Sequence, residues 1–109
     1  MSMFDLVSAQ KKAGVNKDNK EAEYQEIFSE AKKLLEDSLE TKNESTIKKS
    51  ADLFFKALSC SRKNAEPYFY ISVLFYLTNN LEKARIYLNT AKKLNPSLEG
   101  IDNFKVFLY

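Results

Sequence analysis

The side chains that most often perform acid–base and nucleophilic chemistry are nearly absent from this sequence. Its 109 residues contain no His and a single cysteine, Cys60. Without His, neither a Ser-His-Asp triad nor a Cys-His pair can be assembled, and zinc loses its nitrogen ligand. We interpret Cys60 as a small, partly buried hydrophobic residue. We therefore expect no catalytic residue, no metal site, no cofactor and no enzyme activity.

Carboxylates are the remaining candidates for acid–base chemistry. Glu26, Glu30 and Asp37 recur at the spacing of one helix face, which is typical of ordinary solvated positions. With only two glycines in the chain, no glycine-rich phosphate loop is present. These carboxylates do not change the expectation of a non-catalytic protein.

The charged residues are mixed along the chain rather than collected in blocks. The 17 basic and 15 acidic residues leave a net charge of +2, and the basic residues occur as short, separated pairs such as Lys48-Lys49 and Lys92-Lys93. Nucleic-acid-binding surfaces usually cluster Lys and Arg, so no nucleic acid is expected as a partner. No run approaches the roughly eighteen apolar residues of a membrane span, and no basic start precedes an apolar run. We therefore expect no membrane association and a cytoplasmic location.

The composition favours an all-α fold. The chain is 44% apolar with 13% aromatic residues, yet it has only two Gly and two Pro, which turn-rich sheet folds need in number. Apolar residues recur every three to four positions from Glu21 onward, which predicts amphipathic helices. Five helices joined by short turns are expected: from Glu21, over 46–61, after Pro67, over 81–94 and from Ser97 to the end. Ser45 and Ser97 are the expected N-caps, and Asn64 is expected to end a helix in a left-handed conformation.

Residues 1–20 are poor in apolar anchors after Gly14, and we interpret them as a flexible N-terminal segment. The stretch Phe4–Val7 is either a docking peptide for a partner or a loosely ordered end, and the second interpretation is favoured. The helical domain is then expected over 21–109.

The region 65–98 resembles a tetratricopeptide repeat. The residues that carry the resemblance are Tyr68, Ile71, Phe75, Ala84, Leu88, Ala91 and Pro96. Ser72 departs mildly from the Gly or Ala usual in the family. Ala84 and Ala91 lie on one face of the fourth helix, where small side chains let two helices approach closely. The resemblance implies antiparallel helix hairpins stacked as a short superhelix.

The hairpin over 24–63 matches the family less well. Phe54 and Ala57 have the expected spacing, and Ser50 stands where Ala84 stands later, but the first helix and its loop are too long. The fifth helix is expected to begin a third repeat or to cap the array. Its apolar face is expected to comprise Leu98, Ile101, Phe104, Val106, Phe107 and Leu108.

The family resemblance implies a non-catalytic module that holds a protein segment in a groove lined by the first helix of each hairpin. By that resemblance, the partner-binding groove consists of Glu66, Phe69, Val73 and Tyr76. The expected ligand is an apolar or amphipathic segment, and Tyr70 is a further candidate. The alternative is a homodimer formed through the same aromatic face. The remaining alternative is that the fifth helix or residues 3–7 fold over the groove.

Overall fold

The computed structural model describes the backbone of residues 12–109 and the side chains from residue 21 onward. This part of the chain folds into five helices and contains no strand, which confirms the all-α prediction. The helices are α2 (Lys12–Thr41), α3 (Glu44–Cys60), α4 (Ala65–Leu77), α5 (Leu81–Leu94) and α6 (Ile101–Leu108). The predicted apolar stretch Phe4–Val7 lies outside the described residues.

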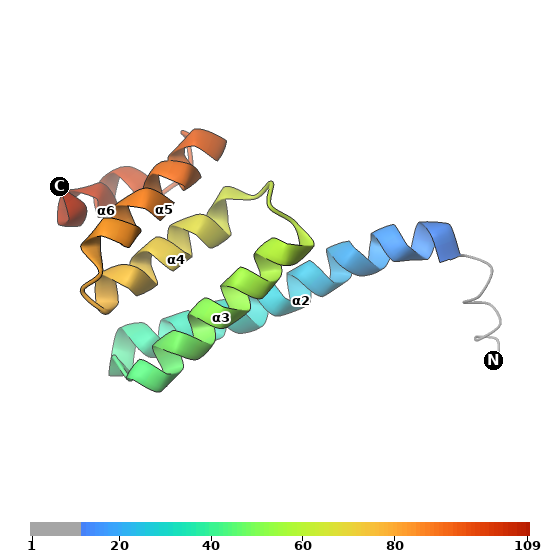
Figure 1. The fold of residues 1–109 in the computed structure, drawn as a ribbon, viewed down its shortest axis with the longest axis horizontal. Helices are drawn as coiled ribbons and strands as arrows, with labels where there is room; N and C mark the ends of the chain where they lie inside the picture. The colour runs from blue at the N-terminus through green and yellow to red at the C-terminus, as the bar shows by residue number, and fades with distance from the viewer. Residues whose placement is uncertain (1–11) are drawn as a thin grey trace.

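The helices form two antiparallel hairpins, α2–α3 and α4–α5, followed by the short helix α6 (Figure 1). The described chain is elongated, with extents of 54 × 30 × 19 Å. Much of the length comes from α2, whose 30 residues span about 45 Å at 1.5 Å per residue. The N-terminal end of α2 projects beyond the hairpin.

Helix α2 begins earlier than the apolar period predicts. Residues 12–20, expected to be flexible, have a helical backbone continuous with the packed part of the helix. Adding residues to an existing helix is much easier than starting one, and no proline interrupts this stretch.

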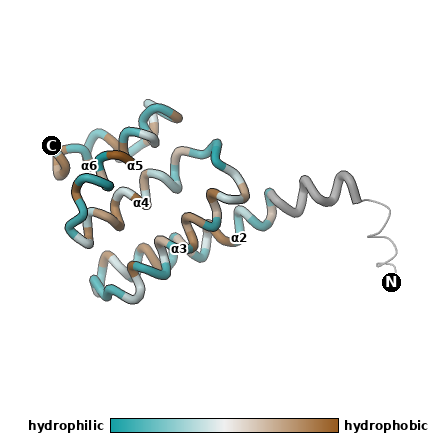
Figure 2. Tube along the Cα trace, viewed as in Figure 1, coloured by the Kyte–Doolittle hydropathy of each residue, from teal (hydrophilic) through white to brown (hydrophobic). Residues whose placement is uncertain are grey.

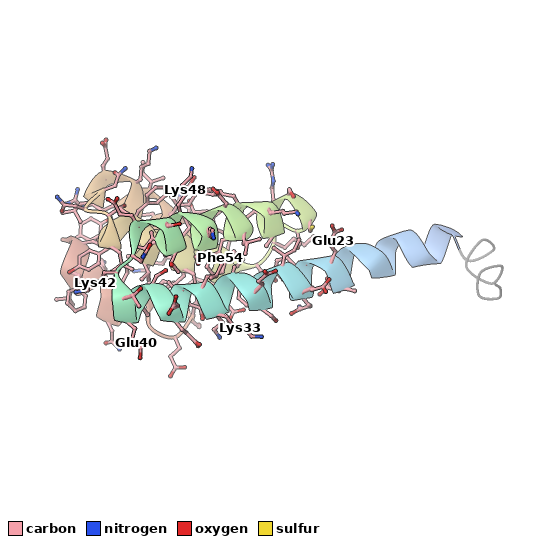
Figure 3. The ribbon with its side chains drawn as sticks, turned by 90° about the horizontal axis from the view of Figure 1, so that it is seen from below. Glu23, Lys33, Glu40, Lys42, Lys48 and Phe54 are labelled. Atoms are coloured by element: carbon pink, nitrogen blue, oxygen red, sulfur yellow. The ribbon has the colours of Figure 1, made fainter. Side chains whose placement is uncertain are left out.

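The first hairpin is held by residues of the predicted stripes. Phe54 is fully buried and lies between α2 and α3, whereas Lys33 and Glu40 project from the side of α2 away from α3 (Figure 3). Burying a phenylalanine side chain contributes about 2–3 kcal/mol. The core between the two hairpins consists of Ala31, Leu35, Ile47, Phe54, Leu58, Ile71 and Leu74.

Helix α4 is apolar on more than one face because it lies in the middle of the assembly. It packs against α3 and α5 and also contacts α2, and its rings reach α6 through Phe69 and Tyr76. Figure 2 shows the contrast with the hydrophilic connection between α3 and α4. Much of the apolar surplus of this helix therefore serves packing within the chain.

The predicted caps at Ser45 and Asn64 are wrong. Asn43, not Ser45, caps α3, because its side chain accepts hydrogen bonds from the backbone N–H groups of Ser45 and Thr46. Asn64 is extended at φ −88° and precedes α4, so it is not a left-handed cap. Among the non-glycine residues that the structure describes, Lys42 and Asn79 have positive φ values.

The fifth helix is shorter than predicted. Ser97 does not cap this helix. The N–H of Ser97 donates a hydrogen bond to the side chain of Asn95 in the preceding turn. Helix α6 begins only after Gly100, which has φ +95°. The predicted apolar face is also wrong in part: Ile101 and Leu108 are buried, but Val106 and Phe107 are 74% and 61% exposed.

Pro67 and two asparagines mark the two ends of α4, which begins at Ala65, before the expected start after Pro67. Pro67 lies in the first turn of α4 and is buried, where a missing backbone N–H costs little. Asn79 and Asn80 return hydrogen bonds to Tyr76 and Phe75 at the end of α4, a pairing that satisfies its last carbonyl groups.

Candidate functional site

The predicted groove residues occupy different surroundings along α4. Glu66 is exposed in the first turn of α4. Its charge helps to raise the pKa of Tyr24 on α2. Phe69, Val73 and Tyr76 are half-buried. Val73 packs on the core between the hairpins, whereas Phe69 and Tyr76 pack beside the core under α6.

Helix α6 brings two of the predicted residues together. The ring of Phe104 lies 5.9 Å from that of Phe69 and 5.6 Å from that of Tyr76, edge-on to both. The fifth helix thus contacts two predicted groove residues, as one of the sequence interpretations proposed. Phe69 is also confined at Gly100, where an added methyl group would lie 3.3 Å from its ring.

These contacts belong to an unbroken series of rings across α2, α4 and α6, which we call the aromatic stripe. Neighbouring rings in the series have centroids 5.4–6.1 Å apart, a separation at which aromatic pairs attract. The stripe consists of Phe28, Tyr70, Phe69, Phe104, Tyr76 and Phe107. It runs across the first helix of each hairpin and onto α6.

The stripe lies at the boundary between core and surface, because all of its rings except Phe107 pack against the core clusters. None of its rings is fully buried, and Phe107 at its end is 61% exposed. The ammonium group of Lys32 lies 5.6 Å from the centre of the Tyr70 ring, a favourable cation–π distance. The arrangement offers a row of apolar rings with one lysine over Tyr70, which suits a partly apolar polypeptide.

Residues outside the predicted groove therefore make up much of the stripe. Phe104 was assigned to the apolar face of the fifth helix, and Phe28 falls in the helical period that begins at Glu21. Recurrence at helical spacing carries no information about which neighbour a residue meets. Tyr70 was only a further candidate, although it joins the two hairpins by contacting Phe28 at 5.9 Å and Phe54 at 5.6 Å. The signal available in the sequence was the density of aromatic residues between Tyr68 and Tyr76.

A second group of rings lies between α3, α4 and α5. Tyr87 is central to it, with Phe75 stacked at 5.5 Å and Phe55 edge-on at 5.9 Å. An open hollow of about 360 Å³ adjoins this group between α3 and α4. Its lining is mainly apolar and includes Ile47, Ala51, Ile71, Leu74 and Phe75.

The groups considered for catalysis do not converge. Glu26, Glu30 and Asp37 are exposed on α2, and Cys60 is half-buried at the end of α3. Among the side chains of residues 21–109, no three His, Cys, Asp or Glu are placed to share a metal ion. No helix within residues 12–109 is both long enough and apolar enough to cross a membrane.

Comparisons with known proteins add no family: the sequence matches no protein-family model, and no curated protein or solved structure is significantly similar to it.

Proposed function

We propose that this protein is a non-catalytic interaction module that binds an apolar or amphipathic segment of a partner protein on the aromatic stripe. The observation that carries the proposal is the row of incompletely buried rings ending at Phe107, which is 61% exposed. Exposed apolar patches of this kind mark interaction sites. The partner is expected to contact Val73 and Tyr76 and to extend toward Phe107.

A tetratricopeptide-like architecture is part of this proposal. It is supported by the second helices of the two hairpins, where Ser50, Phe54 and Ala57 in α3 recur 34 residues later as Ala84, Leu88 and Ala91 in α5. All six side chains are buried. We also propose a cytoplasmic location.

The longer first hairpin fits the same architecture. Its crossing residues, Ala31 and Ser50, are 19 residues apart, whereas Ser72 and Ala84 in the second hairpin are 12 apart. The seven extra residues correspond to about two helical turns, so one additional turn on each helix preserves the faces that meet.

The decisive variant is Phe107→Glu. Phe69→Glu would disturb the packing under α6, because Phe69 contacts Phe104 and lies against Gly100. Phe107 is mostly exposed, so a charge there should leave the helical content unchanged while removing the apolar end of the stripe. Ile86→Glu is the matched control, since Ile86 is 55% exposed on α5 and has no part in the stripe.

The test is a chemical cross-linking pull-down with the native chain and both variants side by side. A protein that is captured by the native chain and by Ile86→Glu, but at least about tenfold less by Phe107→Glu, supports the proposal. Equal capture by all three chains rejects it.

Sedimentation over a range of concentrations examines the alternative, a homodimer through the same face. A dimer that Phe107→Glu dissociates would make the second copy the occupant of the stripe. A monomer at high concentration excludes that alternative.

A further inference from the structure

Helix α6 stands relative to the second hairpin as α4 stands relative to the first. Phe28 contacts Tyr70 with ring centroids 5.9 Å apart, and Phe69 contacts Phe104 at the same separation. Phe28 and Phe69 hold corresponding places in α2 and α4, the first helices of the two hairpins. Each lies three residues before the buried small residue at which its hairpin crosses, Ala31 or Ser72. Phe104 follows Tyr70 by 34 residues. The interface between successive units is therefore repeated once within the chain.

Helix α4 packs against α5, the second helix of its hairpin, through two residues. Ser72 donates a hydrogen bond to α5, and Phe75 stacks on a ring of α5. The positions 34 residues later are Val106 and Tyr109. Val106 is 74% exposed and Tyr109 63% exposed. The side of α6 that corresponds to the α5-binding side of α4 thus presents apolar groups to solvent, and no helix covers it among residues 12–109.

The charges around this side are mixed but mainly positive. Tyr68 of α4 also stacks on α5, and the residue 34 positions later is the exposed Asp102. The guanidinium of Arg85 lies 5.5 Å from the centre of the Tyr109 ring and the ammonium of Lys105 lies 5.9 Å from it. Arg85 also donates a hydrogen bond to the carbonyl of Leu108, which ties α6 to α5. Beside them is an open hollow of about 370 Å³, lined by Asn89, Lys92, Lys93 and Pro96.

The hollow lies where a further helix would pass along α5. In the first unit, Phe55 of α3 contacts Tyr87 of α5. The residue 34 positions after Phe55 is Asn89, which lines the hollow and lies 3.5 Å from the hydroxyl of Tyr109. We call the surface made by Val106, Tyr109, Lys105, Asn89 and Lys92 the end face.

We propose that the end face binds an amphipathic helix of a partner protein, antiparallel to α6, whose apolar side meets Val106 and Tyr109 and whose flank is acidic. The antiparallel direction follows from the relation of α5 to α4. The acidic flank follows from the charge on the end face, because Lys105 and Lys92 are exposed and charge complementarity selects the partner. A symmetric contact of this face with itself in a second copy would bring the same cations together, which opposes that form of self-association.

The probe is a labelled 14-residue helical peptide, the length of α5, with Ala and Leu along one side and Glu along its flank. A second peptide carries Lys in place of every Glu. Binding is measured by fluorescence anisotropy at low salt and at about 0.15 M ionic strength, where screening weakens contacts between exposed charges. The chains are the native protein, Val106→Glu, Lys105→Glu, Phe107→Glu and the control Ile86→Glu, all checked for native helicity by circular dichroism.

The Glu peptide is expected to bind the native chain and Ile86→Glu at least about tenfold more tightly than the Lys peptide does. Val106→Glu should weaken binding about tenfold or more, and Lys105→Glu should reduce the preference for Glu. Salt should weaken binding of the Glu peptide to the native chain.

Four results would overturn the proposal. The first is that the Glu peptide does not bind up to about 1 mM, and the second is that both peptides bind equally. The third is that Phe107→Glu abolishes binding whereas Val106→Glu does not. The fourth is that the native chain forms a dimer that Val106→Glu dissociates. The third places the peptide on the aromatic stripe, and the fourth makes a second copy the occupant of the end face. The other results leave open whether the aromatic stripe binds its own partner.

Discussion

The hydroxyl of Ser72 donates a hydrogen bond of 2.6 Å to the carbonyl oxygen of Ala84, across the crossing of α4 and α5. The first hairpin contains the same pair with the roles exchanged, since Ser50 of α3 donates to Ala31 of α2 at 2.8 Å. All four residues have no exposed surface. Two small side chains at each crossing allow the backbones to approach, and the hydroxyl group finds its acceptor in the facing helix.

Removing the Ser72 hydroxyl should destabilise the protein. Relative to Ser59→Ala, an exposed helical control with the same gain in helix propensity, Ser72→Ala is expected to lower the free energy of unfolding by about 1 kcal/mol. Ser50→Ala should do the same. Because the two bonds share no partner, the double variant should show the sum of the effects. Urea denaturation measures all four variants, and a Ser72→Ala chain as stable as Ser59→Ala would contradict the role given to the bond.

The N-cap of α3 provides a second prediction. Asn43→Ala should cost about 1 kcal/mol of stability, because its side-chain oxygen accepts from two backbone N–H groups. Ser45→Ala should change the free energy of unfolding by less than about 0.5 kcal/mol. Thermal denaturation of both variants compares them directly. A larger loss for Ser45→Ala would show that the helix begins where the sequence alone suggests.

Gly100 is expected to be intolerant of a side chain. Its φ of +95° is strained for any other residue, and an added Cβ would lie 3.3 Å from the Phe69 ring. Gly100→Ala should therefore destabilise the protein by about 1–2 kcal/mol and loosen α6 from α4. Hydrogen exchange of the α6 amides reports the loosening. Ser97→Ala, three residues earlier, serves as the control, and its amide protection should match that of the native chain.

Tyr24 should make stability depend on alkaline pH. Burial raises the pKa of its hydroxyl above the ordinary value of 10.0, aided by the charges of Glu66 and Glu21 and opposed by a hydrogen bond with Asn64. Above pH 10 the unfolded chain loses this proton while the folded chain keeps it, so stability falls as pH rises toward the raised pKa.

The comparison of the native chain with Tyr24→Phe isolates this effect from the titration of Lys. Below pH 10 the difference in unfolding free energy between the two chains should be constant, and above pH 10 it should shift in favour of Tyr24→Phe. Tyr109→Phe, at an exposed position, should follow the native chain throughout. A constant difference between native and Tyr24→Phe up to pH 11 would contradict the raised pKa.

Part of the candidate site was predictable from sequence. The prediction placed Phe69, Val73 and Tyr76 in a groove along the first helix of the second hairpin, and the structure leaves these three half-buried. It did not include Phe28 or Phe104, because each fitted an apolar stripe of its own helix. Glu66 was grouped with these residues by its position in the repeat. In the structure its charge helps to raise the pKa of Tyr24 on the neighbouring helix.

The sequence by itself determined the all-α class, the hairpins and most of the buried positions, including Tyr24, Ala31, Phe54, Ala84 and Leu108. Helical periodicity depends on residues three and four apart, so it can be recognised from a local stretch. Only the tertiary structure decided which stripe meets which. Contacts such as Phe28 with Tyr70 and Phe69 with Phe104 depend on how the helices cross, and a crossing is set by side chains of both helices together. The same dependence explains why Val106 and Phe107, apolar in a pattern that predicts burial, remain exposed where the described part of the chain provides no further helix to cover them.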